Sequence, residues 1–230
     1  MLNFFSNTNI FRWVEKLINF VNSIFFVLFI IAVSIALIFS PPDYLQGDSV
    51  RIMYVHVPAA WIGLASFTAL AVFSVINFVF KIKNLSLINK SIAPIGLTFT
   101  CIAIITGSIW GRPTWGVWWT WDARLTTTLI LALLYSGYLL LNLSLGSLEL
   151  RSKLCSFLGV VIMLEVPIIY KSVSWWRTLH QPPSILATGG SQMSPFILNI
   201  LLCVCFSTIL CALWLIFIRS RNLQMYESLS

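Results

Sequence analysis

Charged side chains are scarce in this chain. Only 9% of its 230 residues are Asp, Glu, Lys or Arg, whereas an average soluble domain contains about 25%. Hydrophobic residues make up 59% of the sequence, and the mean hydropathy is +0.92. A water-facing surface needs charges that this chain lacks, so a soluble enzyme, a disordered chain and a nucleic-acid-binding protein are excluded. The composition predicts an all-α integral membrane protein with several apolar spans.

Sequence features of several common functional sites are also missing. The five cysteines form no Cys-x-x-Cys-His motif, so the chain does not itself carry covalently attached c-type haem. Their odd number and their position in or beside apolar runs do not indicate a disulfide framework. No phosphate-binding loop occurs, so any dependence on ATP must come from a partner.

Six apolar runs are long enough, or nearly long enough, to cross a bilayer. They are continuous rather than alternating, which favours helices over a β-barrel. The first run starts after polar residues and has no small-residue cleavage site behind it, so we expect a signal anchor. We expect a single polytopic membrane domain over 1–230, with spans at 21–40, 57–80, 91–110, 125–143, 154–170 and 196–218.

The basic residues predict the orientation of these spans. Six spans place both termini on the same side of the membrane. Of the 14 Lys and Arg residues, nine fall on the side of the termini and five on the opposite side. The positive-inside rule therefore places both termini in the cytoplasm, or in the mitochondrial matrix. The outer segments are then 41–56, 111–124 and 171–195, and function is expected there because the inner connections are short.

Both histidines of the chain fall in outer segments. His56 ends the first outer segment, and His180 follows shortly after the fifth span. Two imidazoles at the same depth can be the axial ligands of one haem or part of a metal site. The alternative is that each is an interfacial histidine hydrogen-bonded to backbone groups.

Tryptophan is concentrated in and just before the second outer segment, 111–124. Five tryptophans occur in the twelve residues that start at Trp110. We expect a short amphipathic helix on the outer face, because helical spacing would place four side chains of this segment on one face. The four are Trp115, Trp118, Trp119 and Asp122, whereas Trp121 points elsewhere. Such a stripe suits a large planar ligand better than an ordinary interfacial aromatic belt does.

Four arginines share the outer side with the histidines and tryptophans. Guanidinium groups pair bidentately with carboxylates, such as the two propionates of a haem. The alternative is that each arginine marks the topology or extends its charged end to the interface. The four are Arg51, Arg112, Arg124 and Arg177.

Three motifs resemble those of a known family. The sequence Trp115-Gly-Val-Trp-Trp-Thr-Trp-Asp122 is similar to the Trp-Gly-x-Trp-Trp-x-Trp-Asp signature, or WWD motif, of haem-handling membrane proteins. The sequences Tyr54-Val-His-Val-Pro-Ala-Ala60 and Trp175-Trp-Arg-Thr-Leu-His-Gln181 resemble the histidine segments of one branch, the cytochrome c maturation protein C (CcmC) family. The resemblance covers most of the chain.

The resemblance implies a non-enzymatic haem-binding and delivery protein of a bacterial inner membrane, or alternatively of a mitochondrial inner membrane. It implies that haem b is held transiently and non-covalently between His56 and His180. The tryptophan segment supports the haem and helps to dock a periplasmic chaperone that resembles CcmE. We expect this segment to contribute more to transfer than to haem affinity. Subunits that resemble CcmA, CcmB and the small CcmD complete an ATP-binding-cassette assembly.

Two other functions stay open at this point. The first is an enzyme, a haem lyase or cytochrome c synthetase of the same broad family, which uses further histidines within its spans to carry haem. The second is a b-type electron-transfer subunit, which holds haem between helices inside the bilayer. This chain has only two histidines, and neither is expected at mid-membrane, so the sequence disfavours both.

Overall fold

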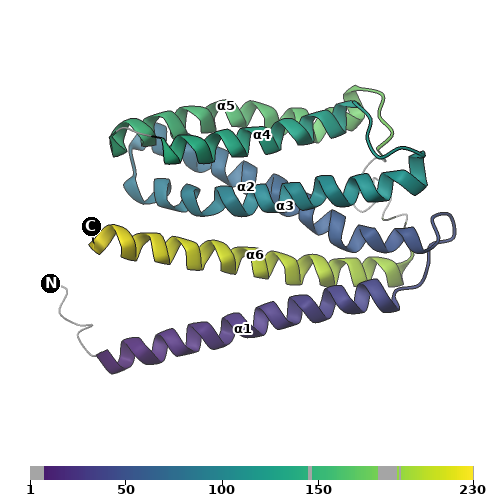
Figure 1. The fold of residues 1–230 in the computed structure, drawn as a ribbon, viewed down its shortest axis with the longest axis horizontal. Helices are drawn as coiled ribbons and strands as arrows, with labels where there is room; N and C mark the ends of the chain where they lie inside the picture. The colour runs from purple at the N-terminus through teal and green to yellow at the C-terminus, as the bar shows by residue number, and fades with distance from the viewer. Residues whose placement is uncertain (1–7, 145–146, 181–190, 192, 230) are drawn as a thin grey trace.

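The computed structural model describes residues 8–144, 147–180, 191 and 193–229. This part of the chain folds into six long helices and one short 3-10 helix (Figure 1). In chain order they are α1 (Thr8–Phe39), η1 (Asp48–Ile52), α2 (Met53–Phe80), α3 (Lys83–Trp115), α4 (Ala123–Leu143), α5 (Leu148–Trp175) and α6 (Pro195–Leu229).

The predicted all-α, multi-pass membrane architecture is confirmed. Among the described residues, five helices are long and apolar enough to cross a membrane, and Ser23–Phe39 of α1 adds a shorter apolar stretch. The whole of α1 has 32 residues, which corresponds to about 48 Å of helix. Each predicted span coincides with one helix, and the helices extend beyond the spans at one or both ends.

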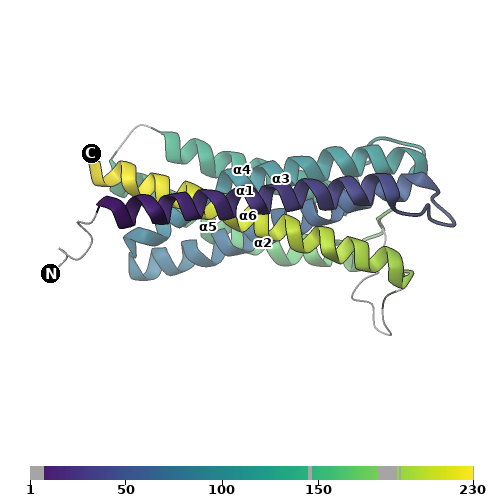
Figure 2. The ribbon, with the colours of Figure 1, turned by 90° about the horizontal axis from the view of Figure 1, so that it is seen from below.

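Helices α2 to α5 form a four-helix bundle. In this bundle α2 packs against α3 and α5, and α4 packs against α3 and α5. Helix α6 covers α2 and α3, and α1 packs along α6 at the edge of the molecule (Figures 1 and 2). Helix α1 begins and α6 ends at the same end of the bundle, the left-hand end in Figure 1, as an even number of crossings requires.

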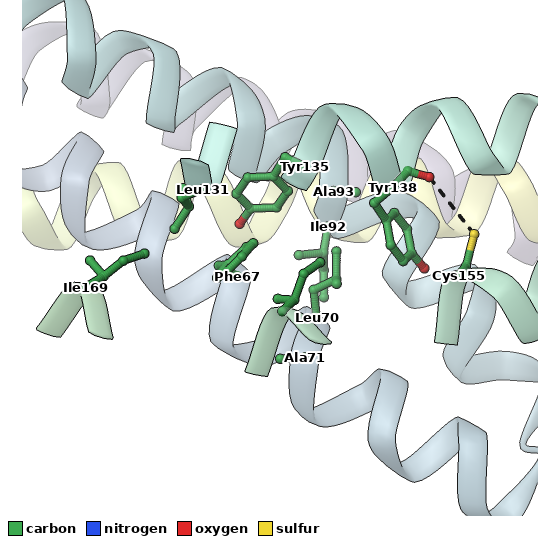
Figure 3. Packing of buried hydrophobic residues seen from close by; sticks show 11 residues of the cluster. Phe67, Leu70, Ala71, Ile92, Ala93, Leu131, Tyr135, Tyr138, Cys155 and Ile169 are labelled. Atoms are coloured by element: carbon green, nitrogen blue, oxygen red, sulfur yellow. Dashed lines mark hydrogen bonds between the residues drawn. The ribbon is translucent and has the colours of Figure 1, made fainter. Parts of the chain in front are cut away.

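The core of the four-helix bundle is built around a cluster of buried hydrophobic side chains (Figure 3). Phe67 of α2 and Tyr135 of α4 meet edge to face, with ring centroids 5.1 Å apart. The Tyr135 hydroxyl donates a hydrogen bond of 2.8 Å to the Gly63 carbonyl. A buried hydroxyl without a partner would be costly at this depth, so this bond also holds α4 against α2.

The tryptophan segment 111–124 does not form the predicted amphipathic helix. Its first residues continue α3, which ends at Gly116 with a φ of 79°, in the left-handed region that favours glycine. The next helix begins directly after Asp122, whose side chain accepts a hydrogen bond of 2.8 Å from the Leu125 amide. The chain between these two caps is irregular, so the predicted stripe of side chains is not formed.

The two histidine segments also differ from the prediction in detail. His56 lies in the first turn of α2, which continues directly from η1, rather than at the end of a loop. In the third outer segment, α5 continues to Trp175, and residues 176–180 are irregular. The remainder of that segment, 181–190 and 192, lies outside the described residues.

The orientation of the bundle can be tested by cysteine labelling. Thr114 is exposed in the last turn of α3, at the end of the bundle where α2 begins, and Lys153 is exposed near the start of α5, at the opposite end. With the exposed native thiols Cys101 and Cys203 replaced by alanine, a membrane-impermeant maleimide added from outside should label Thr114→Cys and leave Lys153→Cys unlabelled until the membrane is opened. The reverse pattern would place the termini outside.

Candidate functional site

A cleft lies among the four bundle helices at the end that carries the histidines. All four helices line it, together with Trp119 from the α3–α4 connection and His180 beyond α5. It contains about 700 Å³ of empty space, counted together with the part that is open to the surroundings. On α2 the lining residues His56, Ala60 and Leu64 follow one another at one-turn spacing, so the cleft extends about 12 Å into the bundle.

His56 is held by a hydrogen bond that defines its chemistry. Its Nδ1 lies 2.9 Å from the carbonyl oxygen of Ala103 on α3. A carbonyl oxygen only accepts, so Nδ1 carries the proton and donates, and this assigns the tautomer with a lone pair on Nε2. Metal-ligating histidines commonly donate their other ring N–H to a backbone carbonyl in this way. The lone pair of the His56 imidazole is therefore on Nε2.

One face of α3 surrounds the His56 ring. Ala103, Thr106, Gly107 and Trp110 recur at helical spacing and lie against it. A Cβ atom on Gly107 would come within 2.8 Å of His56 Cε1, so only glycine permits this approach. The Trp110 ring meets the imidazole edge to face at 5.7 Å. The α3 face thus restricts the imidazole to one position.

The backbone of His180 is held by hydrogen bonds that involve Thr178 of its own segment and Asp122 at the start of α4. The Thr178 hydroxyl donates a hydrogen bond of 2.7 Å to Asp122 Oδ2, and its oxygen accepts one of 3.1 Å from the His180 amide. The Leu179 amide also donates to Asp122 Oδ2, at 3.2 Å. Asp122 Oδ1 caps α4 at Leu125. Asp122, which the sequence suggested as a cofactor-binding residue, thus has both oxygens engaged by donors of the protein.

The tryptophans of the WWD motif divide between the cleft and the surface. Trp119 lines the cleft, and its Nε1 is buried without a hydrogen-bond partner among the described residues. Trp118 and Trp121 are 58% and 75% exposed. Trp115 packs against Gly111 in the last turn of α3. The structure therefore brings one of the four motif tryptophans to the histidines, and the others form no common platform with it.

Only one of the four candidate arginines lines the described cleft. Arg124, at the start of α4, lies beside it and donates through Nη1 to the Ile169 carbonyl at 2.6 Å. Arg51 instead donates to the Ser40 carbonyl through Nε and Nη2, at 3.1 and 2.8 Å, which ties the end of α1 to η1. The other two are exposed, Arg112 hydrogen-bonded to the Gly116 carbonyl and Arg177 at a shallow depression near Trp121.

The donor set of the cleft fits haem better than a bare metal ion. Protein sites for ions such as zinc use three or four side-chain ligands. Within the described ranges, no three His, Cys, Asp or Glu side chains gather to hold an ion. Haem needs only axial ligands from the protein because the porphyrin supplies four nitrogens. Leu64, Leu131 and Ile169 provide apolar walls, and Arg124 and the Trp119 N–H provide donors for a carboxylate.

The fold and the cleft together define a multi-pass helical membrane protein that presents two imidazoles in one cleft near the end of its bundle. Comparison with known families then gives the particular family. The sequence profile of the family CcmC, described as Heme exporter protein C, matches residues 1–229. The chain belongs to this family.

Known relatives agree with this assignment. Heme exporter protein C of Haemophilus influenzae is 40% identical over 186 residues, which cover 80% of this chain and 75% of that protein. The protein of the same name from Escherichia coli K12 is 45% identical over 143 residues, which cover 62% of this chain and 58% of that protein. A putative cytochrome c biosynthesis ccmC-like mitochondrial protein of Marchantia polymorpha is 40% identical over 181 residues, 79% of this chain and 75% of that protein.

Sequence reasoning missed the residues that position the two histidines. The small residues Ala103 and Gly107 allow α3 to approach His56, and their one-turn spacing was the available signal. Thr178 lies inside a motif that was recognised for its histidine alone. Its role was not visible because its partner, Asp122, is 56 residues away in the sequence.

Substitution of Gly107 tests the support of His56. In Gly107→Ala the new methyl group forces the imidazole away from the Ala103 carbonyl, and we expect the free energy of unfolding to fall by about 1–3 kcal/mol. The matched control is Gly137→Ala on α4, where a Cβ would meet only Leu158 at 3.9 Å. Thermal unfolding in detergent should show a lower Tm for the first variant alone, and equal Tm values for both would contradict the described packing.

Proposed function

We propose that this chain binds haem at the outer face of the membrane and delivers it to a periplasmic haem chaperone during the maturation of c-type cytochromes. The proposal rests on one observation: the two histidines of the chain line the same cleft. The bond from His56 to Ala103 also leaves Nε2 as the ligand atom. The names of the relatives, heme exporter protein C and a cytochrome c biosynthesis protein, support the same role.

In this proposal His56 and His180 are the two axial ligands of one haem b, bound without a covalent bond to the chain. Arg124 and Trp119 Nε1 are the donors for a propionate, because both residues line the cleft and Nε1 has no hydrogen-bond partner within the described part of the chain. A guanidinium has five N–H donors, so Arg124 keeps several after its bond to Ile169. The apolar edge of the porphyrin then lies against the deeper walls of the cleft.

The exposed indoles are proposed as the surface that receives the chaperone. Trp118 and Trp121 adjoin Trp119, and Trp121 meets it edge to face at 5.6 Å. Exposed tryptophans next to a cargo site are suited to protein contacts, because indoles are enriched among the residues that dominate binding energy. A chaperone bound there would lie beside the open side of the cleft. Two side-chain ligands and partial enclosure keep the release of haem possible.

In this proposal the chain works in an ATP-binding-cassette assembly of the CcmABCD type. The chain has no phosphate-binding loop, so a CcmA-like subunit supplies ATP hydrolysis, and CcmB-like and CcmD-like subunits complete the membrane part. The chain is a multi-pass protein of an inner membrane, bacterial by most relatives and mitochondrial by the plant ones. A haem lyase or a b-type electron-transfer subunit is less well supported, because both histidines lie toward one end of the bundle.

Co-purification tests this function directly. The full chain, solubilised from cells that make haem, should carry about one haem per chain and should retain a CcmE-like chaperone only when haem is present. A chain free of haem under these conditions would contradict haem binding. Haem that is retained with a stable redox potential, and with no chaperone interaction, would favour the electron-transfer alternative.

The histidine pair makes a specific spectroscopic prediction. His56→Ala or His180→Ala should convert six-coordinate low-spin haem into a five-coordinate or poorly occupied form, and free imidazole should partly restore the low-spin spectrum. Loss of even an indirect ligand partner weakens metal binding about 10–100-fold, so the double variant should retain little haem. An unchanged low-spin spectrum in the double variant would refute the assignment and return both histidines to ordinary interfacial roles.

The separation of the tryptophans predicts two different phenotypes. Trp118→Ala with Trp121→Ala should weaken the chaperone complex about tenfold or more while the chain keeps its haem. Trp119→Ala should lower haem retention, because it removes the Nε1–H donor, and a hydrogen bond to a charged group contributes about 1.5–3 kcal/mol. Trp214→Phe, on α6 and away from the cleft lining, is the control. Haem loss and chaperone binding should be measured on the same samples. Identical phenotypes for the two sets of variants would contradict separate roles for Trp119 in haem binding and for Trp118 and Trp121 in docking.

A further inference from the structure

The two histidines of the cleft are supported by different kinds of structure. His56 belongs to α2 and is enclosed by one face of α3. His180 lies on irregular chain, after the end of α5 at Trp175. A helix fixes its residues through its own hydrogen bonds, whereas an irregular segment depends on bonds to other parts of the protein. The position of His180 therefore has to come from contacts that its segment makes.

Two hydrogen bonds of that segment end on one carboxylate. Asp122 Oδ2 accepts from the Thr178 hydroxyl at 2.7 Å and from the Leu179 amide at 3.2 Å. The Thr178 oxygen in turn accepts from the His180 amide at 3.1 Å. Hydrogen bonds to an ionised carboxylate are about twice as strong as those between neutral groups. Thr178 thus couples the backbone of His180 to Asp122 with one hydroxyl group.

Asp122 is itself fixed to the bundle. Its Oδ1 accepts from the Leu125 amide at 2.8 Å and so forms the N-cap of α4. Two residues further on, Arg124 lines the cleft. The same carboxylate therefore sets the start of the helix that carries Arg124 and the position of the segment that carries His180. A shift of either Asp122 oxygen would therefore move the His180 imidazole relative to the other residues that line the cleft.

We propose that Asp122 and Thr178 form a latch that holds His180 at the iron position, with both acting as positioning residues rather than haem contacts. This inference rests on the proposed function, since it assigns a role toward the axial ligand pair. With both hydrogen bonds formed, His180 would be held beside His56 as the second ligand of a haem. Without them, the support of His180 would be weaker, and a haem would depend more on His56 alone and would be easier to transfer. The WWD aspartate thus controls the exchange of haem through the second histidine.

Substitution of the threonine tests the latch. Thr178→Val keeps the shape of the side chain and removes both hydrogen bonds, whereas Thr178→Ser keeps the hydroxyl. With ferric haem added to the full chain in nanodiscs, Thr178→Val should give a high-spin five-coordinate spectrum that imidazole returns to low spin. Its haem should pass to an apo-globin acceptor about tenfold faster than from the unmodified chain. Thr178→Ser should behave as the unmodified chain.

Two further variants separate the latch from general folding. Asp122→Asn retains a good N-cap for α4, but its amide nitrogen cannot accept from Thr178, so it should shift the spectrum in the same direction as Thr178→Val. Ser174→Ala, near the end of α5, removes a hydroxyl that bonds only to the Lys171 carbonyl among the described residues, and it should change nothing. If Thr178→Val does not fold, the contrast between Asp122→Asn and Ser174→Ala carries the test.

Hydrogen exchange without haem gives an independent readout. The Leu179 and His180 amides are donors in the latch, so a peptide over 177–180 should exchange faster in Thr178→Val and Asp122→Asn than in Thr178→Ser and Ser174→Ala. The latch alone would be overturned if the unmodified chain forms low-spin haem and if Thr178→Val and Asp122→Asn leave both the spectrum and the hydrogen exchange unchanged. Unmodified chain that forms no low-spin haem would overturn the proposed function, and the role of the latch with it.

Discussion

The hydrogen bond from His56 Nδ1 to the carbonyl oxygen of Ala103 defines the chemistry of the cleft. Ala103 lies in the middle of α3, so its carbonyl holds the imidazole in one tautomer and one orientation before any ligand arrives. Gly107 is part of the same constraint, because a side chain there would occupy the space of the ring. The His56 side chain then loses little conformational freedom when a ligand binds to Nε2, and preorganisation of this kind favours binding.

A cargo protein must bind its ligand and also release it, and the cleft combines features that serve both needs. The fixed imidazole on α2 and the apolar walls contributed by all four bundle helices favour capture. The second imidazole lies on irregular chain, whose position depends on side-chain hydrogen bonds. The exposed Trp121 lines the same shallow depression as Thr178 and Leu179 of this segment. Helical support for one imidazole and support by side-chain hydrogen bonds for the other agree with the proposed transfer of haem.

The helices and the two histidines could be predicted from sequence, because apolar runs inside a bilayer must form helices and because the chain has no other histidine. The amphipathic tryptophan helix was predicted wrongly, since periodicity contains no information on the left-handed turn at Gly116 or the cap at Asp122. The choice among the arginines was also out of reach. It depends on which helix ends meet at the cleft: Arg124 starts α4 beside it, whereas Arg51 bonds to the end of α1.

The most direct measurement of the central claim uses the fact that the chain has only two histidines. The protein would be made with ¹⁵N-histidine, purified through a tag without histidine and loaded with ferric haem of natural isotope content. Pulsed electron paramagnetic resonance on the low-spin iron then counts the histidine nitrogens bound to it. Two coupled ¹⁵N nuclei are predicted, and these can come only from His56 and His180. One coupled ¹⁵N nucleus, or none, would contradict a haem held between the two histidines.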